Sequence, residues 1–405
     1  MTWRTSSAVE SNFSYEPIVA LDESGSTQVI WSVSNQQSGA KELVARRFVL
    51  GRNAPGPTFV IHSGVGTNIF CYRATSENND NVTVIWLQND FGAGSRIMAS
   101  RYTGALEDWE PPVELQRITG TVSCPKILAD KSGNTLAVWD VIRTDATAGT
   151  NVTDIYSAYR PVGNAWDIPR LVASDSVGFA SLHPEFAMNG NGTAVAVWES
   201  YTGPIRSAFF TPTNGWSNVT ELESTSGGER QQVVMDSTGN VLFLWIYRGQ
   251  AFARFYRPGP GWSAVEAIST TDDVARTCLK VTERGEGSVV WTTYSSGMST
   301  VWARSFSTAT GSLSPPQLLQ HPAVPFGNWA CDIDGEGSVS VLWNGIYNYA
   351  SSLYATRFVP SSGWQTSVAM YSGSLSNSQV SLDVSENGKA VAAWESWGVY
   401  VNFYY

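Results

Sequence analysis

GNTLAVW, residues 133–139, is the stretch that decides the fold, because near copies of it recur along the whole chain. Four of these copies are GSTQVIW at 25–31, GTAVAVW at 192–198, GNVLFLW at 239–245 and GKAVAAW at 388–394. Each is a short apolar run that begins at a turn-forming residue and ends on tryptophan, as expected of a buried strand that follows a hairpin. One motif repeated along 405 residues predicts a repeat architecture.

The tryptophan that ends the motif occurs in eight copies: Trp31, Trp86, Trp139, Trp198, Trp245, Trp291, Trp343 and Trp394. Six residues before each one stands a glycine or, once, an aspartate: Gly25, Asp80, Gly133, Gly192, Gly239, Gly285, Gly337 and Gly388. Both residue types tolerate the positive φ of a tight hairpin. Because Asp or Asn often stands nine residues before the tryptophan, the D-x-x-G pattern predicts a turn between two strands.

Two further apolar runs follow each motif tryptophan. The first ends on an aromatic residue: Phe48, Tyr102, Tyr159, Phe210, Tyr256, Phe306, Phe358 or Tyr404. The second most often opens with another tryptophan: Trp109, Trp166, Trp216, Trp262 or Trp364. Four strands in each of eight units predict one all-β domain over residues 1–405, an eight-bladed β-propeller of four-stranded blades.

The two ends of the sequence predict how the ring closes. The last repeat stops after its third run, VNFYY at 401–405, whereas TWRTSSAVE at 2–10 matches the fourth runs GWSAVEAIS at 261–269 and GWSNVTELE at 215–223. We therefore expect residues 1–10 to supply the outer strand of the last blade. Such an exchange closes the ring and removes an open sheet edge.

Charge and composition restrict the partners. The formal net charge is −10 and the isoelectric point is about 4.9, so the protein repels phosphate backbones and anionic lipids. We expect no nucleic-acid partner and no membrane insertion, because no apolar run approaches the roughly 18–20 residues of a spanning helix. The N-terminus lacks the basic and apolar regions of a signal peptide.

The four cysteines fit no zinc-ligand spacing and are too few for a disulfide scaffold. They are Cys71, Cys124, Cys278 and Cys331, all in the run that precedes a motif tryptophan. We expect reduced, buried thiols, with a disulfide or a reactive group as the alternative.

Candidate ligand-binding positions lie where the repeats disagree, at the start of the strand that lines the channel. Fifteen residues before each tryptophan stand Glu16, Cys71, Cys124, His183, Arg230, Arg276, Asn328 and Gln379. Just after the tryptophans, on the same predicted face, come Asp140, Glu199 and Glu395, followed by the aromatic residues Tyr201, Tyr247, Tyr294, Tyr347 and Trp397. Aromatic faces beside polar groups suit recognition of sugars or peptides. The alternative is that unburied positions simply diverge between repeats.

Individual members of this ring carry little specific chemistry. Arg230 and Arg276 are equivalent residues of adjacent repeats and can hold one carboxylate. His183 has no second histidine or acid cluster beside it, so no metal or cofactor and no catalytic residue is predicted. The acidic stretch DIDGEG at 332–337 coincides with the repeated hairpin and lacks the remaining ligands of a calcium loop. Five N-x-S/T sites, at Asn12, Asn81, Asn151, Asn191 and Asn218, fit turn composition.

The combination of GNTLAVW, IYSAYR (155–160) or LYATRF (353–358), and GWSAVEAI (261–268) or GWQTSVAM (363–370) resembles a repeat in exported bacterial β-propeller proteins. The chain is also distantly similar to bacterial propeller lectins, which bind sugars between blades with tryptophan. That resemblance makes Trp109, Trp166, Trp216, Trp262 and Trp364 peripheral candidate sites, with packing between blades as the alternative. Sialidase-like propellers carry S-x-D-x-G-x-x-W turns, whereas Gly and Trp are six residues apart here.

The function hypothesis is a non-catalytic recognition module that binds carbohydrate, outside the cell or at its surface, with a cytoplasmic location left open. Two alternatives remain. The first is a protein-interaction scaffold. The second is a glycoside hydrolase or lyase that uses paired carboxylates such as Glu199 with Asp140 or Glu395. The oligomeric state is not predicted.

Overall fold

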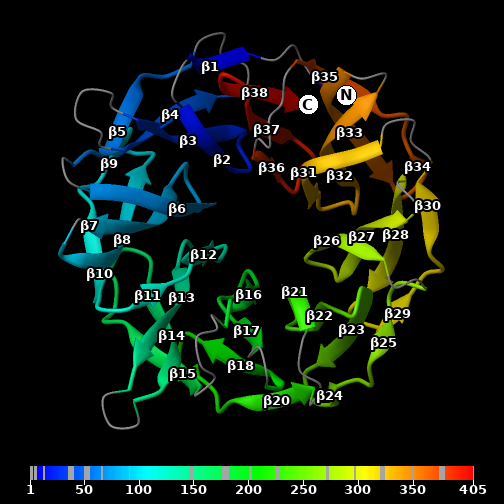
Figure 1. Ribbon diagram of the computed structural model, residues 1–405, viewed down its shortest axis with the longest axis horizontal. Coiled ribbons are helices and arrows are strands. Elements are labelled where there is room, and N and C mark those ends of the chain that lie inside the picture. The colour runs from blue at the N-terminus through cyan, green and yellow to red at the C-terminus, as the bar shows by residue number, and fades with distance from the viewer. Residues whose placement is uncertain are drawn as a thin grey trace.

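Eight antiparallel sheets surround a central axis in the computed structural model (Figure 1). The structure describes the chain except residues 1–2, 4–6, 12–13, 35–40, 50–54, 65–66, 91, 146–148, 176–181, 200–202, 224–227, 271–272, 296–297, 320–323, 348–349, 374–378 and 405. The predicted all-β eight-bladed propeller is therefore confirmed, and the blades are numbered 1 to 8 in chain order.

The strands fall into four classes by their distance from the axis. The innermost strands are β2 (Ser14–Leu21), β6 (Thr67–Ser76), β11 (Thr121–Val122) with β12 (Lys126–Ala129), β16 (Glu185–Met188), β21 (Gly228–Met235), β26 (Val274–Val281), β31 (Val324–Ile333) and β36 (Val380–Val384). The second strands, which carry the motif tryptophans, are β3 (Ser26–Ser34), β7 (Val82–Asp90), β13 (Thr135–Thr144), β17 (Ala194–Glu199), β22 (Val241–Tyr247), β27 (Glu286–Ser295), β32 (Val339–Tyr347) and β37 (Ala390–Glu395).

The third and outer strands complete each blade. The third strands are β4 (Lys41–Val49), β8 (Gly94–Thr103), β14 (Asn151–Arg160), β18 (Ile205–Thr211), β23 (Gln250–Arg257), β28 (Met298–Ser307), β33 (Ala350–Val359) and β38 (Gly398–Tyr404). The outer strands are β5 (Thr58–His62), β9 (Asp108–Trp109) and β10 (Val113–Ile118), β15 (Arg170–Asp175), β19 (Gly215–Trp216) and β20 (Thr220–Glu223), β24 (Gly261–Trp262) and β25 (Glu266–Ala267), β29 (Ser312–Leu313) and β30 (Gln317–Leu319), β34 (Gly363–Trp364) and β35 (Val368–Ser372), and β1 (Ser7–Ser11).

The core lies between the blades, because each sheet buries both of its faces. The motif tryptophans are all buried, and those of blades 1, 2, 3, 4 and 8 are fully inaccessible to solvent. A typical core cluster joins Leu136 and Val138 of blade 3 to Ala196 and Trp198 of blade 4. This two-sided burial explains why the second strands read as continuous apolar runs rather than as alternating ones.

The D-x-x-G pattern is a side-chain-capped hairpin. In blade 3, Asp130 Oδ1 accepts hydrogen bonds from the backbone N–H groups of Ser132 at 2.8 Å and Asn134 at 2.9 Å. Gly133 has a φ of 87°, the left-handed region that favours glycine. The acidic stretch at 332–337 forms the same turn, since Asp334 Oδ1 accepts from Glu336 N and Ser338 N.

The N-terminal strand closes the ring, as predicted. β1 pairs with β38 in antiparallel register, from Ser7 opposite Val401 to Ser11 opposite Gly398, beside β38 in Figure 1. Trp3 forms a bridge with Tyr404, and their ring centroids lie 5.4 Å apart. Residues 1–2 and 4–6 of the predicted strand lie outside the described residues. β1 therefore covers the edge of β38, which would otherwise be open.

The prediction of reduced thiols is wrong. Cys71 is bonded to Cys124, and Cys278 is bonded to Cys331, with Cα atoms 5.2 Å and 6.3 Å apart respectively. The first bond links β6 to the segment between β11 and β12, and the second links β26 to β31. In both cases the innermost segments of adjacent blades converge toward the axis and bring the two cysteines within bridging distance. The bonds cross the seams between blades 2 and 3 and between blades 6 and 7, on opposite sides of the ring in Figure 1.

Candidate functional site

The residues fifteen before the motif tryptophans lie on one side of the disc, at or beside irregularities of the innermost strands. We call this side, with the loops between second and third strands, the bulge face. The register shifts at Tyr15/Ile18, Phe70/Tyr72 and Glu229/Gln232 enclose Glu16, Cys71 and Arg230. Arg276 borders a fourth shift, and Asn328 lies within a fifth, although the structure does not describe its side chain.

Four of these residues have a left-handed backbone without being glycine. The φ angles are 55° at Glu16, 39° at Cys71, 41° at His183 and 54° at Arg230. A bulge adds a residue to one strand and redirects its side chain, and such positions are frequent beside functional sites. His183 and Arg230 are exposed, as is Gln379, which precedes β36. The equivalent position therefore presents a different side chain in each of these blades.

The backbone at Glu16 is held from two neighbouring blades. The Tyr72 hydroxyl of blade 2 lies 2.9 Å from Tyr15 O and 2.5 Å from Glu16 O, and it accepts a hydrogen bond from Ser32 N at 3.1 Å. From blade 8, Glu395 Oε2 accepts a hydrogen bond from Glu16 N at 3.2 Å. Burial, and then the charge of Glu16, raises the pKa of Glu395. The bulge is thus fixed by surrounding structure.

The carboxylates that directly follow motif tryptophans contact the next blade. Asp140 Oδ2 of blade 3 accepts a hydrogen bond from Leu182 N of blade 4 at 2.9 Å. Glu199 of blade 4 accepts from Gly228 N and, at 2.7 Å, from Gln231 Nε2 of blade 5. Together with Glu395, these side chains cap backbone groups at the start of the following innermost strand, which would otherwise present an open edge. Their proposed ligand contacts stay a prediction.

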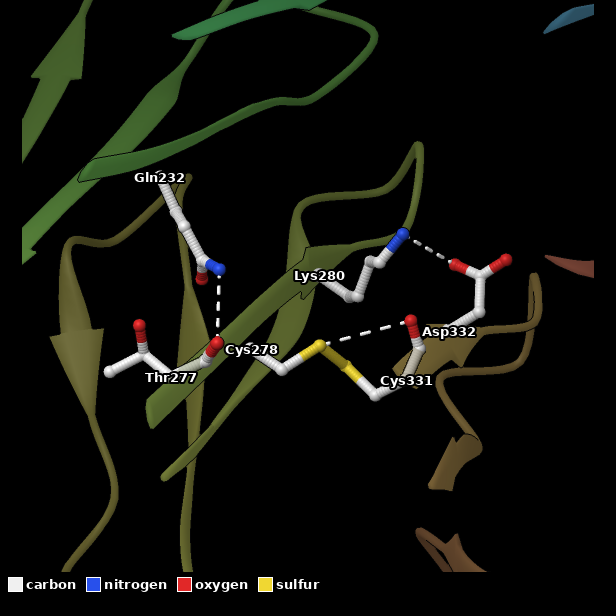
Figure 2. The surroundings of a disulfide bond; sticks show 6 residues. All are labelled: Gln232, Thr277, Cys278, Lys280, Cys331 and Asp332. Atoms are coloured by element: carbon white, nitrogen blue, oxygen red, sulfur yellow. Dashed lines mark hydrogen bonds and ion pairs between the residues drawn. A yellow bond between two sulfur atoms is a disulfide. The ribbon is translucent and has the colours of Figure 1, made fainter. Parts of the chain in front are cut away.

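Lower on the channel wall, polar side chains connect blades 6, 7, 8 and 1. Figure 2 shows Lys280 Nζ directed at Asp332 Oδ1, 2.9 Å away, beside the disulfide between Cys278 and Cys331. Asp332 Oδ2 accepts a hydrogen bond from Val384 N at 2.8 Å.

Asp383 continues this chain of contacts by accepting a hydrogen bond from Leu21 N at 2.8 Å. Burial, followed by the charge of Asp332, raises the pKa of Asp383 to about 7. One carboxyl group at the closing seam therefore titrates near neutral pH.

A basic sector occupies the bulge face in blades 5 and 6. Arg230 is exposed and Arg276 is half-buried. Burial, together with the charge of Arg230, lowers the pKa of the Arg276 guanidinium. Neither forms an ion pair with a residue that the structure describes.

Exposed aromatic side chains also lie on the bulge face. Trp397 is 84% exposed and Tyr294 is 60% exposed, whereas the motif tryptophans are buried. Tyr15 and Phe70, each directly before a bulge residue, are partly exposed as well. Trp397 has a φ of 57° in the turn between β37 and β38, where Ser396 N donates to Gly398 O at 2.8 Å. Tyr201 and the side chain of Tyr347 lie outside the described residues.

The outer tryptophans pack against the third strands of their own blades. The ring centroids of Trp109 and Tyr102, Trp216 and Phe210, Trp262 and Tyr256, and Trp364 and Phe358 lie 5.2 to 5.7 Å apart. Trp166 lies under the Arg160 guanidinium, 5.8 Å from ring centroid to Cζ. Trp216 Nε1 also donates to Ser157 Oγ of the preceding blade. These contacts are those of residues that fill blade edges and seams.

A cavity that the sequence analysis did not single out opens on the opposite side, the turn face, where the D-x-x-G hairpins meet. Its volume is about 1170 Å³, and its acidic lining residues are Asp22, Glu23, Glu77, Asp80, Asp130, Glu283 and Glu386. Lys131 of blade 3 crosses this end of the channel, with Nζ 2.8 Å from Glu283 Oε2 and 3.1 Å from Glu386 Oε1. The sequence feature that indicates this cavity is the number of acidic residues in the D-x-x-G hairpins, which otherwise look purely structural.

Within the described ranges, no three His, Cys, Asp or Glu side chains gather as metal ligands would. Nothing helical in the described chain has the length and hydropathy that a bilayer crossing requires. The two disulfides, in contrast, are typical of proteins that fold outside the reducing cytoplasm.

No protein-family model matches the chain, and no curated protein sequence matches it significantly. Among solved structures, a prolyl endopeptidase gives a TM-score of 0.53 at 11% identity, over 96% of this chain and 54% of that one. The Hadza microbial sialidase Hz136 gives 0.42 at 11% identity, over 71% and 66%. The Aleuria aurantia lectin, in complex with α-methyl-L-fucoside, gives 0.41 at 12% identity, over 90% and 98%.

The chain spans about half of the prolyl endopeptidase and slightly less than two thirds of the sialidase. At 11% identity the likeness to the prolyl endopeptidase extends to the fold alone.

Proposed function

We propose that the protein is a non-catalytic module that binds carbohydrate through its bulge face, outside the cell or at its surface. The observation that carries the proposal is Trp397, an exposed indole in a left-handed backbone. A left-handed conformation costs a residue with a Cβ about 1–2 kcal/mol. Exposing the indole forgoes the free energy that burying a large aromatic ring supplies. A binding role for Trp397 accounts for both costs.

The neighbouring groups support a sugar ligand. Glu16 and Glu395, with the partly exposed ring of Tyr15, lie at the start of blade 1 and the end of blade 8, beside the turn that carries Trp397. An aromatic face stacks on the apolar face of a pyranose, while carboxylates accept hydrogen bonds from its hydroxyl groups.

The three candidate catalytic carboxylates already form structural contacts. This favours a non-catalytic role over the glycosidase alternative. Asp140, Glu199 and Glu395 each accept a hydrogen bond from the backbone of the next blade, so all three already serve a structural contact between blades. The disulfides support a location outside the cytoplasm.

The test is a glycan array followed by titration calorimetry on the full chain. We expect one or more glycans to bind and Trp397→Ala to abolish or strongly weaken that binding. Ile168→Ala is the matched control, because Ile168 is 85% exposed on the loop before β15, away from the bulge residues. Absence of binding to every glycan, with a stoichiometric protein partner recovered instead, would reject this function in favour of the scaffold.

A further inference from the structure

A second part of the bulge face combines three arginines with aromatic rings. Arg230 is the bulge residue of β21, and Arg276 is the equivalent residue of β26 in the next blade. Arg248 lies with Gly249 in the two-residue turn between β22 and β23, since Tyr247 pairs with Gln250. Arg248 has a φ of 49° and an exposed side chain.

Backbone contacts bring the three arginines into one sector. Gly228, two residues before Arg230, pairs with Tyr247, which directly precedes Arg248. Gly249 O, directly after Arg248, accepts a hydrogen bond from Val274 N, two residues before Arg276. The length of that bond is 2.8 Å, so the turn of blade 5 and the innermost strand of blade 6 are in direct contact.

These three guanidinium groups have no ion-pair partner among the described residues, although the chain carries a net charge of −10. Elsewhere arginines such as Arg47, Arg101 and Arg160 pair with carboxylates.

Among the described residues, the acids that adjoin the sector form no ion pair with these arginines. Glu199 accepts hydrogen bonds from Gly228 N and Gln231 Nε2, and Asp273 forms no ion pair with a described residue. The structure does not describe the Glu229 side chain. Like charges held close together attract an anion into the space between them.

Aromatic faces accompany the cations. Tyr294 is 60% exposed, and its N–H donates to Asp273 O at 3.1 Å, which holds it near the start of β26. The ring of Tyr247 lies under Arg248, with Cζ 5.1 Å from the ring centroid. Guanidinium forks bind carboxylate and sulfate oxygens through paired N–H groups, and an exposed tyrosine ring offers a face to a sugar.

We propose that Arg230, Arg248 and Arg276 bind the anionic group of an acidic glycan, a uronate carboxylate or a sulfate ester, with Tyr294 stacked on the adjoining sugar ring. This rests on the proposed function and assigns it a ligand class. The guanidinium groups supply the positive charge and the paired N–H donors.

The experiment titrates the full-length protein with polygalacturonate, which carries only carboxylates, with dextran sulfate, which carries only sulfates, and with neutral dextran. We expect an acidic polymer to bind and neutral dextran not to compete. Arg230→Gln and Arg276→Gln should each weaken binding by at least about tenfold, since a charged hydrogen bond is lost. Arg170→Gln is the control, because Arg170 is an exposed arginine on outer strand β15.

The polymer that binds more tightly through these arginines identifies the anion as carboxylate or sulfate. If Arg170→Gln weakens binding as much as Arg230→Gln does, the proposal is overturned. Binding would then depend on the net charge and not on a specific site. Failure of both acidic polymers to bind a protein that still binds neutral glycans through Trp397 would overturn this inference and leave the proposed function standing. If neither acidic nor neutral glycans bind, both fail.

Discussion

The strongest quantitative prediction concerns the disulfide between Cys278 and Cys331, which joins blades 6 and 7. The two cysteines are 53 residues apart in the sequence, and crosslinking a loop of that length stabilises a fold by about 4 kcal/mol through the lost entropy of the unfolded chain. For 405 residues the entropy of unfolding is about 0.85 kcal/mol/K, so replacing both cysteines by serine should lower Tm by about 5 °C.

Differential scanning calorimetry of the oxidised protein and of the Cys278→Ser/Cys331→Ser variant measures this loss. The bond between Cys71 and Cys124 closes a loop of the same 53 residues, so its double serine variant is an internal control with the same expected loss. Thiol titration of the denatured, unreduced wild type should detect no free thiol. Four titratable thiols, or a change in Tm below about 1 °C for both variants, would refute the reasoning.

Three further predictions follow from the packing and the charges. Removing residues 1–11 uncovers β38 and exposes Val399 and Val401, so Tm should fall by several degrees, and an unchanged melting curve would contradict closure by β1. Because burial raises the pKa of Asp383 to about 7, the folded protein binds a proton that the unfolded chain, with a pKa near 4, releases. Stability should therefore increase as pH falls from about 8 to about 5, by at most about 1.4 kcal/mol per pH unit, and Asp383→Asn should remove this dependence in denaturant titrations across that range. Trp198→Ala should cost about 3–5 kcal/mol because the side chain is fully buried, whereas Trp397→Ala should cost almost nothing, and a similar loss in both would contradict the assigned burial.

The architecture was predictable because packing repeats in the sequence. Each blade needs one large buried residue in its second strand and one residue with positive φ in its first hairpin, and Trp139 with Gly133 illustrates both. Closure was predictable for the same reason, since Trp3 pairs with Tyr404 as Trp262 pairs with Tyr256.

The cysteine pairing was within reach of the sequence but was missed. Cys71 and Cys124 hold the same position of adjacent repeats, which in a ring places them on neighbouring innermost strands. The repeat position of the cysteines, rather than their number, is the feature that predicts their pairing. Cys278 and Cys331 are also 53 residues apart, although their positions relative to the motif tryptophans differ by one residue.

The geometry of the candidate site was only partly predictable. Counting from the tryptophans located Arg230 and Arg276, but the bulges and left-handed angles depend on contacts with neighbouring blades, such as those of Tyr72 with Glu16. Likewise, the hydrogen bond from Leu182 N to Asp140 forms across a seam between blades, and no local sequence pattern encodes it.

The strand bulges also bear on how the protein could change its specificity. At Glu16, His183 and Arg230 the backbone φ lies in the left-handed region although the side chains share no chemistry, so the scaffold accepts different residues at this repeat position. Mutations there leave the buried tryptophans untouched. A combinatorial library randomised at these positions should therefore retain folded members at high frequency, which makes the ring a suitable starting point for directed evolution of new binders.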